Sequence, residues 1–249
     1  MQPGASGFAC TVLIPAHNEA LTIREIAADA LVHSSHVMVI SDGSTDETVA
    51  CLEDLQVQVV AHPDNLGKGP RLAEGLDLAA EGGFTHVLTM DADGQHIADD
   101  IPAFTAAAKT NPNALILGDR MGTGTAMPQG RARSISIGDF FITWATGHRL
   151  RDGQCGMRVY PVALWQGLRL NALDTQHFVF ETAILMHAAE AGAPFVRVPI
   201  AARYGDVVKR PSHFRPARDT WRICGAIARF ILCGWFRPRG LLIALGLLR

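Results

Sequence analysis

The stretch H-V-L-T-M-D-A-D-G-Q-H, residues 86–96, places two carboxylates directly after a short apolar run. A run such as residues 86–90 is typical of a strand that is buried on both faces of a parallel sheet. Asp91 and Asp93 follow it, separated only by the small side chain of Ala92. Because ligands of open α/β sheets bind beyond the carboxyl ends of the strands, we expect these aspartates to line a binding site.

Similar apolar runs recur on both sides of this stretch and alternate with helix-like segments. The predicted strands cover residues 10–15, 36–41, 57–61, 86–90 and 114–118, and the predicted helices cover residues 19–32, 45–55, 69–81 and 99–109. Such alternation predicts an α/β fold with a Rossmann-like, mostly parallel sheet flanked by helices. Beyond it we expect a long Gly- and Pro-rich loop over residues 119–133, helices over 134–147 and 180–191, and strands over 155–160 and 195–200.

Polar residues follow four of the predicted strands. They are A-H-N-E at 16–19, D-G-S-T-D at 42–46, H-P-D-N-L-G-K-G at 62–69 and D-A-D-G-Q-H at 91–96. Carboxylates on alternate residues suit Mg²⁺ or Mn²⁺, ions that share their coordination with substrate phosphates. We therefore predict a metal site at Asp91 and Asp93, to which Gln95 could add a neutral oxygen. The alternative is that both aspartates are solvated turn residues.

Other motifs narrow the class of protein. Asp42 could reach a ribose hydroxyl or a base edge from its tight turn, or could cap the helix that follows. The segment around Lys68 lacks the spacing of a Walker loop, and no G-x-G-x-x-G follows the first strand, which weighs against ATPases and dinucleotide enzymes. The histidines, His96 among them, lack the spacing of metal ligands, so we expect them in loops or around the residues that bind the metal, without contacting it.

The ordered segments I-P-A-H-N-E, S-D-G-S-T-D, N-L-G-K-G, D-A-D-G-Q-H and D-G-Q-C-G-M-R resemble family 2 glycosyltransferases of the GT-A fold, especially the dolichyl- and polyprenyl-phosphate hexose synthases. The resemblance covers roughly residues 10–205. It implies that Asp91 and Asp93 reach the donor diphosphate through Mg²⁺ or Mn²⁺, with Gln95 as a further metal ligand. The implied donor-binding residues are Pro15, Ala16, Asn18, Glu19, Asp42, Lys68, Asp91, Ala92 and Asp93.

The resemblance also assigns basic residues to phosphate. It implies that Arg120, Arg131, Arg133 and Arg158 face the acceptor or donor phosphate, and we group Arg203 and Lys209 with the acceptor side. Two positions depart from the family pattern. Ser41 stands where a carboxylate is usual, which affects the nucleoside contacts. Cys155 begins C-G-M-R where the family has S-G-F-R, which alters the acceptor side and leaves the acceptor open.

The expected chemistry follows from charge. Cleavage of the bond between the anomeric carbon and the diphosphate develops negative charge, which a cation with nearby Lys or Arg stabilises. The resemblance implies inversion. An acceptor phosphate is already anionic, whereas a hydroxyl acceptor needs a general base, for which Asp152 and Glu181 are the candidates. Glu181 could equally be a buried carboxylate paired with Arg158 or Arg203. The predicted catalytic residues are therefore Asp91, Asp93, Asp152, Glu181 and Arg158.

The C-terminal part is basic and apolar. Eleven of the 22 Lys and Arg residues lie from Arg197 onward, opposed only by Asp206 and Asp219. We divide the chain into a catalytic domain, residues 1–205, and a membrane-associating tail, residues 206–249, that forms an amphipathic helix. The alternative is a helix packed on the domain with solvated arginines. The chain is 48% hydrophobic, yet no apolar stretch reaches the roughly 20 residues of a spanning helix.

These observations predict the partners and the location. We expect a UDP- or GDP-hexose donor, a lipid or polyprenyl-phosphate acceptor, a membrane surface and no nucleic acid, because apolar residues interleave with the basic ones. Five cysteines without a C-x-x-C pair and no signal peptide favour a peripheral or monotopic protein on the cytoplasmic face. Two alternatives are a sugar-nucleotide-forming nucleotidyltransferase, which would need a Gly-rich first loop ending in a base, and a catalytically silent nucleotide-sugar-binding module, for which Ser41 is the hint.

Overall fold

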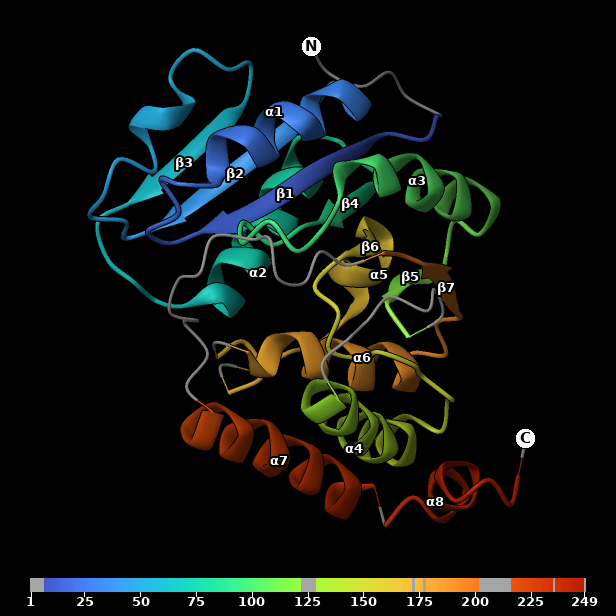
Figure 1. Ribbon diagram of the computed structural model, residues 1–249. Coiled ribbons are helices and arrows are strands. Elements are labelled where there is room, and N and C mark those ends of the chain that lie inside the picture. The colour runs from blue at the N-terminus through green and yellow to red at the C-terminus, as the bar shows by residue number, and fades with distance from the viewer. Residues whose placement is uncertain are drawn as a thin grey trace.

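A seven-stranded sheet organises the protein, with helices on both of its faces (Figure 1). The computed structural model describes residues 7–121, 129–171, 173–176, 178–201, 216–234 and 236–248. The strands are β1 (Cys10–Ala16), β2 (Val37–Asp42), β3 (Gln58–His62), β4 (His86–Thr89), β5 (Leu115–Asp119), β6 (Arg158–Pro161) and β7 (Phe195–Pro199). Their order is β3-β2-β1-β4-β6-β5-β7. Only β6 runs antiparallel to its neighbours, β4 and β5, so the predicted mostly parallel sheet is confirmed.

The helices largely follow the predicted pattern. They are α1 (Ile23–His33), α2 (Lys68–Glu81), α3 (Ile101–Thr110), α4 (Gln129–Thr146), α5 (Val162–Gly167), α6 (Val179–Glu190), α7 (Pro216–Cys233) and α8 (Pro238–Ala244), with short 3-10 turns η1 (Ala50–Leu52) and η2 (Ala98–Asp100). The short α5 was not predicted. Helix α4 begins at Gln129, so Arg131 and Arg133 lie on a helix and not on the expected loop, of which residues 122–128 lie outside the described part.

The helix predicted over residues 45–55 is wrong, since only the 3-10 turn η1 forms there. Polar side chains explain the difference, because they bond to the segment after β1 instead of capping a helix. Ser44 Oγ accepts the main-chain N–H of Asn18 at 3.1 Å, and Asn18 Oδ1 accepts the N–H of Thr45 at 2.8 Å. Asp46 accepts the N–H groups of Ala20 and Thr48. These bonds join the loops that follow β1 and β2.

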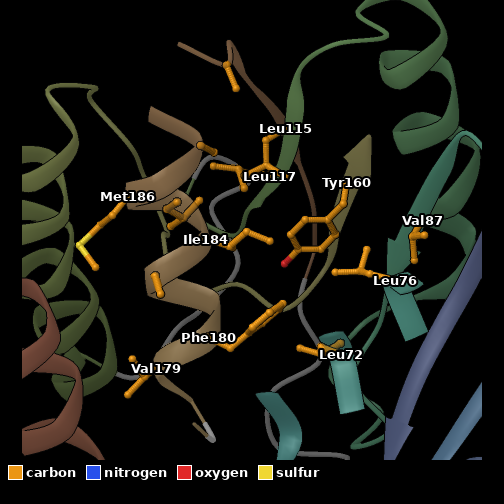
Figure 2. Close-up of a cluster of buried hydrophobic side chains, with 14 of the residues drawn as sticks. Leu72, Leu76, Val87, Leu115, Leu117, Tyr160, Val179, Phe180, Ile184 and Met186 are labelled. Carbon is orange, nitrogen blue, oxygen red and sulfur yellow. The ribbon is translucent and has the colours of Figure 1, made fainter. Parts of the chain in front are cut away.

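Two apolar layers hold the helices against the sheet. Successive residues of β1 point to opposite faces, so Leu13 packs with α2 and α6 while Val12 and Ile14 pack with α1 and α3. Figure 2 shows the first layer, in which Leu72 and Leu76 of α2 face Tyr160 of β6 and Phe180 of α6. All of these side chains are almost completely buried. The sheet and helix α2 therefore form a rigid base for the loops at the carboxyl ends of the strands.

The C-terminal helices α7 and α8 pack on α4 and α6 (Figure 1). Ala226, Ile227 and Ile231 of α7 belong to the same buried cluster as α6. Arg229 Nη2 lies 2.7 Å from Asp174 Oδ1, which adds an ion pair to this packing. Of the two interpretations of the tail, packing on the domain therefore holds for one face of α7. Within the described residues, no helix has the length and apolar character needed to cross a bilayer.

Helix α8 approaches α4 so closely that glycine is required at the contact. A Cβ atom on Gly240 would lie 2.1 Å from the main-chain oxygen of Trp144. We expect Gly240→Ala to cost about 1–3 kcal/mol and to expose residues 238–244 to faster hydrogen exchange, because backbone atoms must move. Gly225→Ala on α7 is the matched control, since nothing lies within 4 Å of its added Cβ. Equal exchange rates in residues 238–244 of both variants would contradict the packing of α8 on α4.

Candidate active site

The loop that precedes α2 is fixed by the carboxylate of Asp42 at the end of β2. Asp42 Oδ1 accepts the N–H of Leu66 at 2.8 Å and Nε of Arg71 at 2.8 Å, and Oδ2 accepts the N–H of Gly67 at 2.7 Å. Gly67 has a φ of 94°, which favours glycine. The carboxylate of the buried Asp42 therefore holds the N-L-G-K-G loop. These hydrogen bonds fix the backbone position of Lys68.

Lys68, the first residue of α2, joins two carboxylates from distant parts of the chain. Its Nζ lies 2.5 Å from Asp91 Oδ1 and 3.1 Å from Glu181 Oε1. Burial opposes the charged ammonium, yet the negative charges of Asp91 and Glu181 dominate and raise the pKa of Lys68. Burial likewise opposes ionisation of Asp91, but the neighbouring Lys68 charge holds the pKa of Asp91 well below its usual range. Lys68 and Asp91 are therefore both charged at neutral pH.

The turn that carries Asp91 is held from three directions. The N–H of Asp91 donates to Nδ1 of His96 at 3.1 Å, and Thr22 Oγ1 donates to the main-chain oxygen of Ala92 at 2.7 Å. On the third side, a Cβ added to Gly156 would lie 2.4 Å from Asp91 Oδ2, so that loop leaves room only for glycine. The Asp91 carboxylate therefore has little freedom to move.

The donor set at this edge fits a magnesium or manganese ion. Asp91 and Asp93 supply carboxylate oxygens from one turn, and Asp93 Oδ1 also accepts the N–H of Gln95 at 3.0 Å. Among the described residues, no group of three or more His, Cys, Asp or Glu side chains could hold a metal alone. Mg²⁺ typically binds through one or two carboxylates and takes its other ligands from water and substrate phosphates. The site therefore suits an ion that arrives with a diphosphate.

The predicted nucleoside residues meet at the same edge of the sheet. Ala16 is the register partner of Ser41, so β1 and β2 end side by side. Asn18 has a φ of 53° and is held by Ser44 and Thr45, while the N–H of Glu19 donates to Thr48 Oγ1 at 2.7 Å. The structure thus brings Pro15, Ala16, Asn18 and Glu19 to the edge that carries Asp42 and Asp91. Ser41, which replaces the usual carboxylate, donates its hydroxyl to Ser44 at 2.9 Å.

Asp152, one candidate for a general base, is paired with a buried arginine. It accepts Nε and Nη2 of Arg120, both at 2.6 Å, and the main-chain N–H of Arg120 at 3.0 Å. Both side chains are about 95% or more buried. The second candidate, Glu181, lies instead beside Lys68 and Asp91. Of the two carboxylates, Glu181 is therefore the one next to the predicted metal site.

Arg158 is fully buried and its guanidinium donates to main-chain oxygens. Its Nε, Nη1 and Nη2 donate to the carbonyls of Cys155, Glu181 and Gly153 at 2.8, 2.6 and 2.8 Å. Arg158 therefore joins the C-G-M-R segment to the first turn of α6. The Glu181 carboxylate pairs with Lys68 and not with Arg158, which instead bonds the main-chain oxygen of Glu181.

The remaining predicted residues are placed less completely. Arg133 is exposed on α4, and Arg131 lies two residues before it on the same helix. Arg203 and Lys209 lie outside the described residues.

Three further residues shape the geometry of the site. His96 accepts the N–H of Asp91, which agrees with a position around the predicted metal ligands. Gly156 was noted only as part of C-G-M-R. Asp139 of α4 accepts the N–H groups of Asp152 and Gly153, both at 2.8 Å. The positions of His96 and Gly156 inside the quoted motifs were the signal available, whereas Asp139 had none.

Comparison with known proteins gives the family. The profile of Glycosyl transferase family 2 matches residues 11–164. Polyprenol monophosphomannose synthase of Mycolicibacterium smegmatis is 26% identical over 202 residues, which cover 76% of this chain and 75% of that protein. Undecaprenyl-phosphate mannosyltransferase of Micrococcus luteus is 28% identical over 200 residues, covering 76% of this chain and 81% of that one.

A solved structure shares the fold. Glucosyl-3-phosphoglycerate synthase from Mycobacterium tuberculosis, crystallised with Mn²⁺, uridine diphosphate and phosphoglyceric acid, superposes with a TM-score of 0.68 at 18% identity. The superposition covers 91% of this chain and 78% of that one. The GT-A fold expected from the sequence is therefore confirmed.

The partly buried carboxyl group of Asp139 should make the stability of the protein depend on pH. Burial raises the pKa of Asp139 to about 6, and the charges of Asp152 and Asp119 add to this effect. The protonated carboxyl group of Asp139 is the form that the folded state favours. Its contribution to the free energy of unfolding is therefore complete below about pH 4 and is lost as the pH rises through about 6. The free energy of unfolding of Asp139→Asn, relative to that of the wild type, should therefore rise by about 2 kcal/mol between pH 4 and pH 7, since one pKa unit corresponds to about 1.36 kcal/mol.

Urea unfolding across this pH range measures the difference. The exposed Glu47→Gln variant controls for the loss of one carboxylate. A stability difference between Asp139→Asn and the wild type that stays constant with pH would contradict the role given to burial.

Proposed function

Because the chain belongs to glycosyl transferase family 2, we propose that it is an inverting enzyme that transfers a hexose from a UDP- or GDP-linked donor to a polyprenyl-phosphate acceptor. The ion cluster of Lys68, Asp91 and Glu181 beside Asp93 is the observation that carries this proposal. It concentrates carboxylates and one ammonium at the sheet edge where ligands of such folds bind. The names of the two mannosyltransferase relatives support a polyprenyl-phosphate acceptor.

In this proposal each residue at the edge has a distinct task. Asp91 and Asp93, with Gln95, bind the divalent cation, and Lys68 contacts the donor diphosphate. When bound, the cation neutralises charge on the leaving diphosphate. Asp42 lies on the nucleoside side in this scheme, and its carboxylate also holds the loop before Lys68. Pro15, Ala16, Asn18 and Glu19 line the nucleoside side.

The ion pairs of Asp152 and Glu181 favour an acceptor that needs no general base. An acceptor phosphate is anionic and needs no proton removed, which suits a site in which both carboxylate candidates, Asp152 and Glu181, are paired with cations. Arg133 of α4 is exposed and available for a phosphate, and Arg131, Arg203 and Lys209 remain candidates for the same task. Arg120 and Arg158 serve in this proposal to hold the loop around Asp152 and Gly156.

We further propose that α7 and α8 rest on a membrane surface. The face of α7 opposite its packed residues carries Trp221, which is 79% exposed, and Leu232, which is 69% exposed. Leu245 and Leu247 next to α8 are 55% and 68% exposed. No acidic residue occurs after Asp219, while five arginines do. Arg229 and Arg237 are paired with Asp174 and Glu190, and the remaining positive charge of the segment suits anionic headgroups. The five free cysteines support a reducing setting, hence the cytoplasmic face.

The reaction is tested by substituting the two aspartates. Asp91→Asn and Asp93→Asn should each reduce release of nucleoside diphosphate by about 100-fold or more, as expected for lost transition-state stabilisation. The assay contains UDP- or GDP-hexose, Mn²⁺ and polyprenyl phosphate, and the exposed Asp99→Asn variant is the control. Full transfer by both variants, or no release by the wild type with any donor, would contradict the proposal.

The same assay distinguishes the acceptors. Polyprenyl phosphate should be glycosylated, whereas the unphosphorylated polyprenol should not, because it lacks the anionic nucleophile. Transfer to phosphoglyceric acid instead of polyprenyl phosphate would show that the acceptor is a soluble phosphate compound and would refute the lipid part of the proposal.

Membrane association is tested with vesicles. Trp221→Ser combined with Leu232→Ser should weaken sedimentation with anionic vesicles at least about tenfold, because each large apolar side chain contributes about 1.5–3 kcal/mol when buried. Val32→Ser on α1 is the matched control, since Val32 is 76% exposed but lies far along the chain from the tail. Unchanged sedimentation of the double variant would rule out this face as the docking surface.

A further inference from the structure

The ammonium of Lys68 contacts one of the two carboxylate oxygens of Asp91, a residue predicted to bind the metal ion. Its Nζ is 2.5 Å from Asp91 Oδ1, and the three side chains of the cluster are largely buried, at 18% exposure for Lys68, 28% for Asp91 and 11% for Glu181. A divalent cation that takes Asp91 Oδ1 as a ligand would stand next to this ammonium. The two cations would repel each other in a partly desolvated place, where such repulsion is strong.

The side chain of Lys68 can move in response. Its backbone is fixed at the start of α2, because the preceding Leu66 and Gly67 N–H groups are bound to the carboxylate of Asp42. The four-carbon side chain of lysine is flexible, and its ammonium is a compact point charge. Glu181 already contacts the ammonium and is itself held by Arg158 through its main-chain oxygen. Lys68 can therefore leave Asp91 while it keeps Glu181.

The balance of charges favours replacement of Lys68 by a metal ion at Asp91 only when a diphosphate is present. A metal ion alone takes the partner of Lys68 and brings two positive charges beside it. A diphosphate brings its own negative charge, so that Lys68 gains a new partner and the metal gains further oxygen ligands. Arg120, the neighbouring buried arginine, is paired with Asp152 and so does not replace Lys68 in this exchange.

We propose that Lys68 acts as a resident counter-ion on Asp91, which makes tight binding of the divalent cation dependent on the donor diphosphate. This inference rests on the proposed function of the same site and adds an order of binding to it. Thermodynamic reciprocity requires that the metal strengthens nucleotide binding by the same factor. In the absence of donor, Lys68 then keeps the carboxylates paired without a metal.

Removal of the Lys68 charge should make binding of the metal ion independent of nucleotide binding. Lys68→Met should bind Mn²⁺ alone about tenfold more tightly than the wild type, and the strengthening of Mn²⁺ binding by UDP or GDP should fall at least about tenfold. Electron paramagnetic resonance of free Mn²⁺ measures this without any turnover. Lys68→Arg should retain the nucleotide dependence, because it keeps the charge.

Lys109→Met is the matched control. It removes the same charge from α3, where the ammonium lies 5.3 Å from the ring of Phe8, a residue that precedes β1 and thus lies at the opposite edge of the sheet. Its Mn²⁺ binding should equal that of the wild type. If Lys68→Met binds Mn²⁺ alone no more tightly than Lys109→Met, while nucleotide still strengthens binding fully, the inference is overturned. If the wild type binds no Mn²⁺ with any nucleoside diphosphate, the proposed function itself fails.

A second measurement needs no folded Lys68 variant. The chain has only three lysines, Lys68, Lys109 and Lys209, so their side-chain signals are resolvable by NMR after lysine labelling. Mg²⁺ alone should leave the Lys68 signal in place, and Mg²⁺ with UDP or GDP should shift it. A shift of equal size with Mg²⁺ alone would overturn the proposed order of binding.

Discussion

The ion pair between Lys68 and Asp91 connects the parts of the chain from which the site is built. Lys68 is positioned by the end of β2 through Asp42, and Asp91 follows β4 and is framed by His96 and Gly156. Glu181 extends the pair to α6. The backbone of each partner is anchored, so the flexible side chain of Lys68 is the part of the pair that can change its partner. The polar edge of the sheet therefore has a fixed backbone arrangement, which suits the cation and diphosphate proposed to bind there.

Helix α4 links this edge to the C-terminal helices. Asp139 accepts two N–H groups of the loop that carries Asp152, and one and a half turns further on Trp144 contacts the turn before α8 through its hydrogen bond to Phe236. The tail is therefore continuous with the domain in its packing, while Trp221 and Leu232 remain exposed. A surface that rests on lipid would thus stand at a fixed distance from the sheet edge.

The sequence predicted most of the fold because buried strands of a parallel sheet are continuous apolar runs, and polar motifs follow them directly. It failed at residues 45–55, where Ser44 and Asp46 bond to the neighbouring loop and only the 3-10 turn η1 forms. Asp42, Asp91 and Lys68 could be assigned to one edge from their motifs. The burial of Arg158 and its carbonyl partners could not, because a motif gives residue types and not the direction of a side chain.

The central claim is that Asp91 and Asp93 hold a divalent cation against a nucleoside diphosphate. A crystal structure with Mn²⁺ and UDP or GDP, with anomalous data collected at the manganese edge, tests it most directly. The account predicts one manganese peak between both carboxylates and the diphosphate, with Lys68 Nζ moved from Asp91 to a phosphate oxygen. A nucleotide bound at another edge of the sheet, or manganese bound without either aspartate, would contradict it.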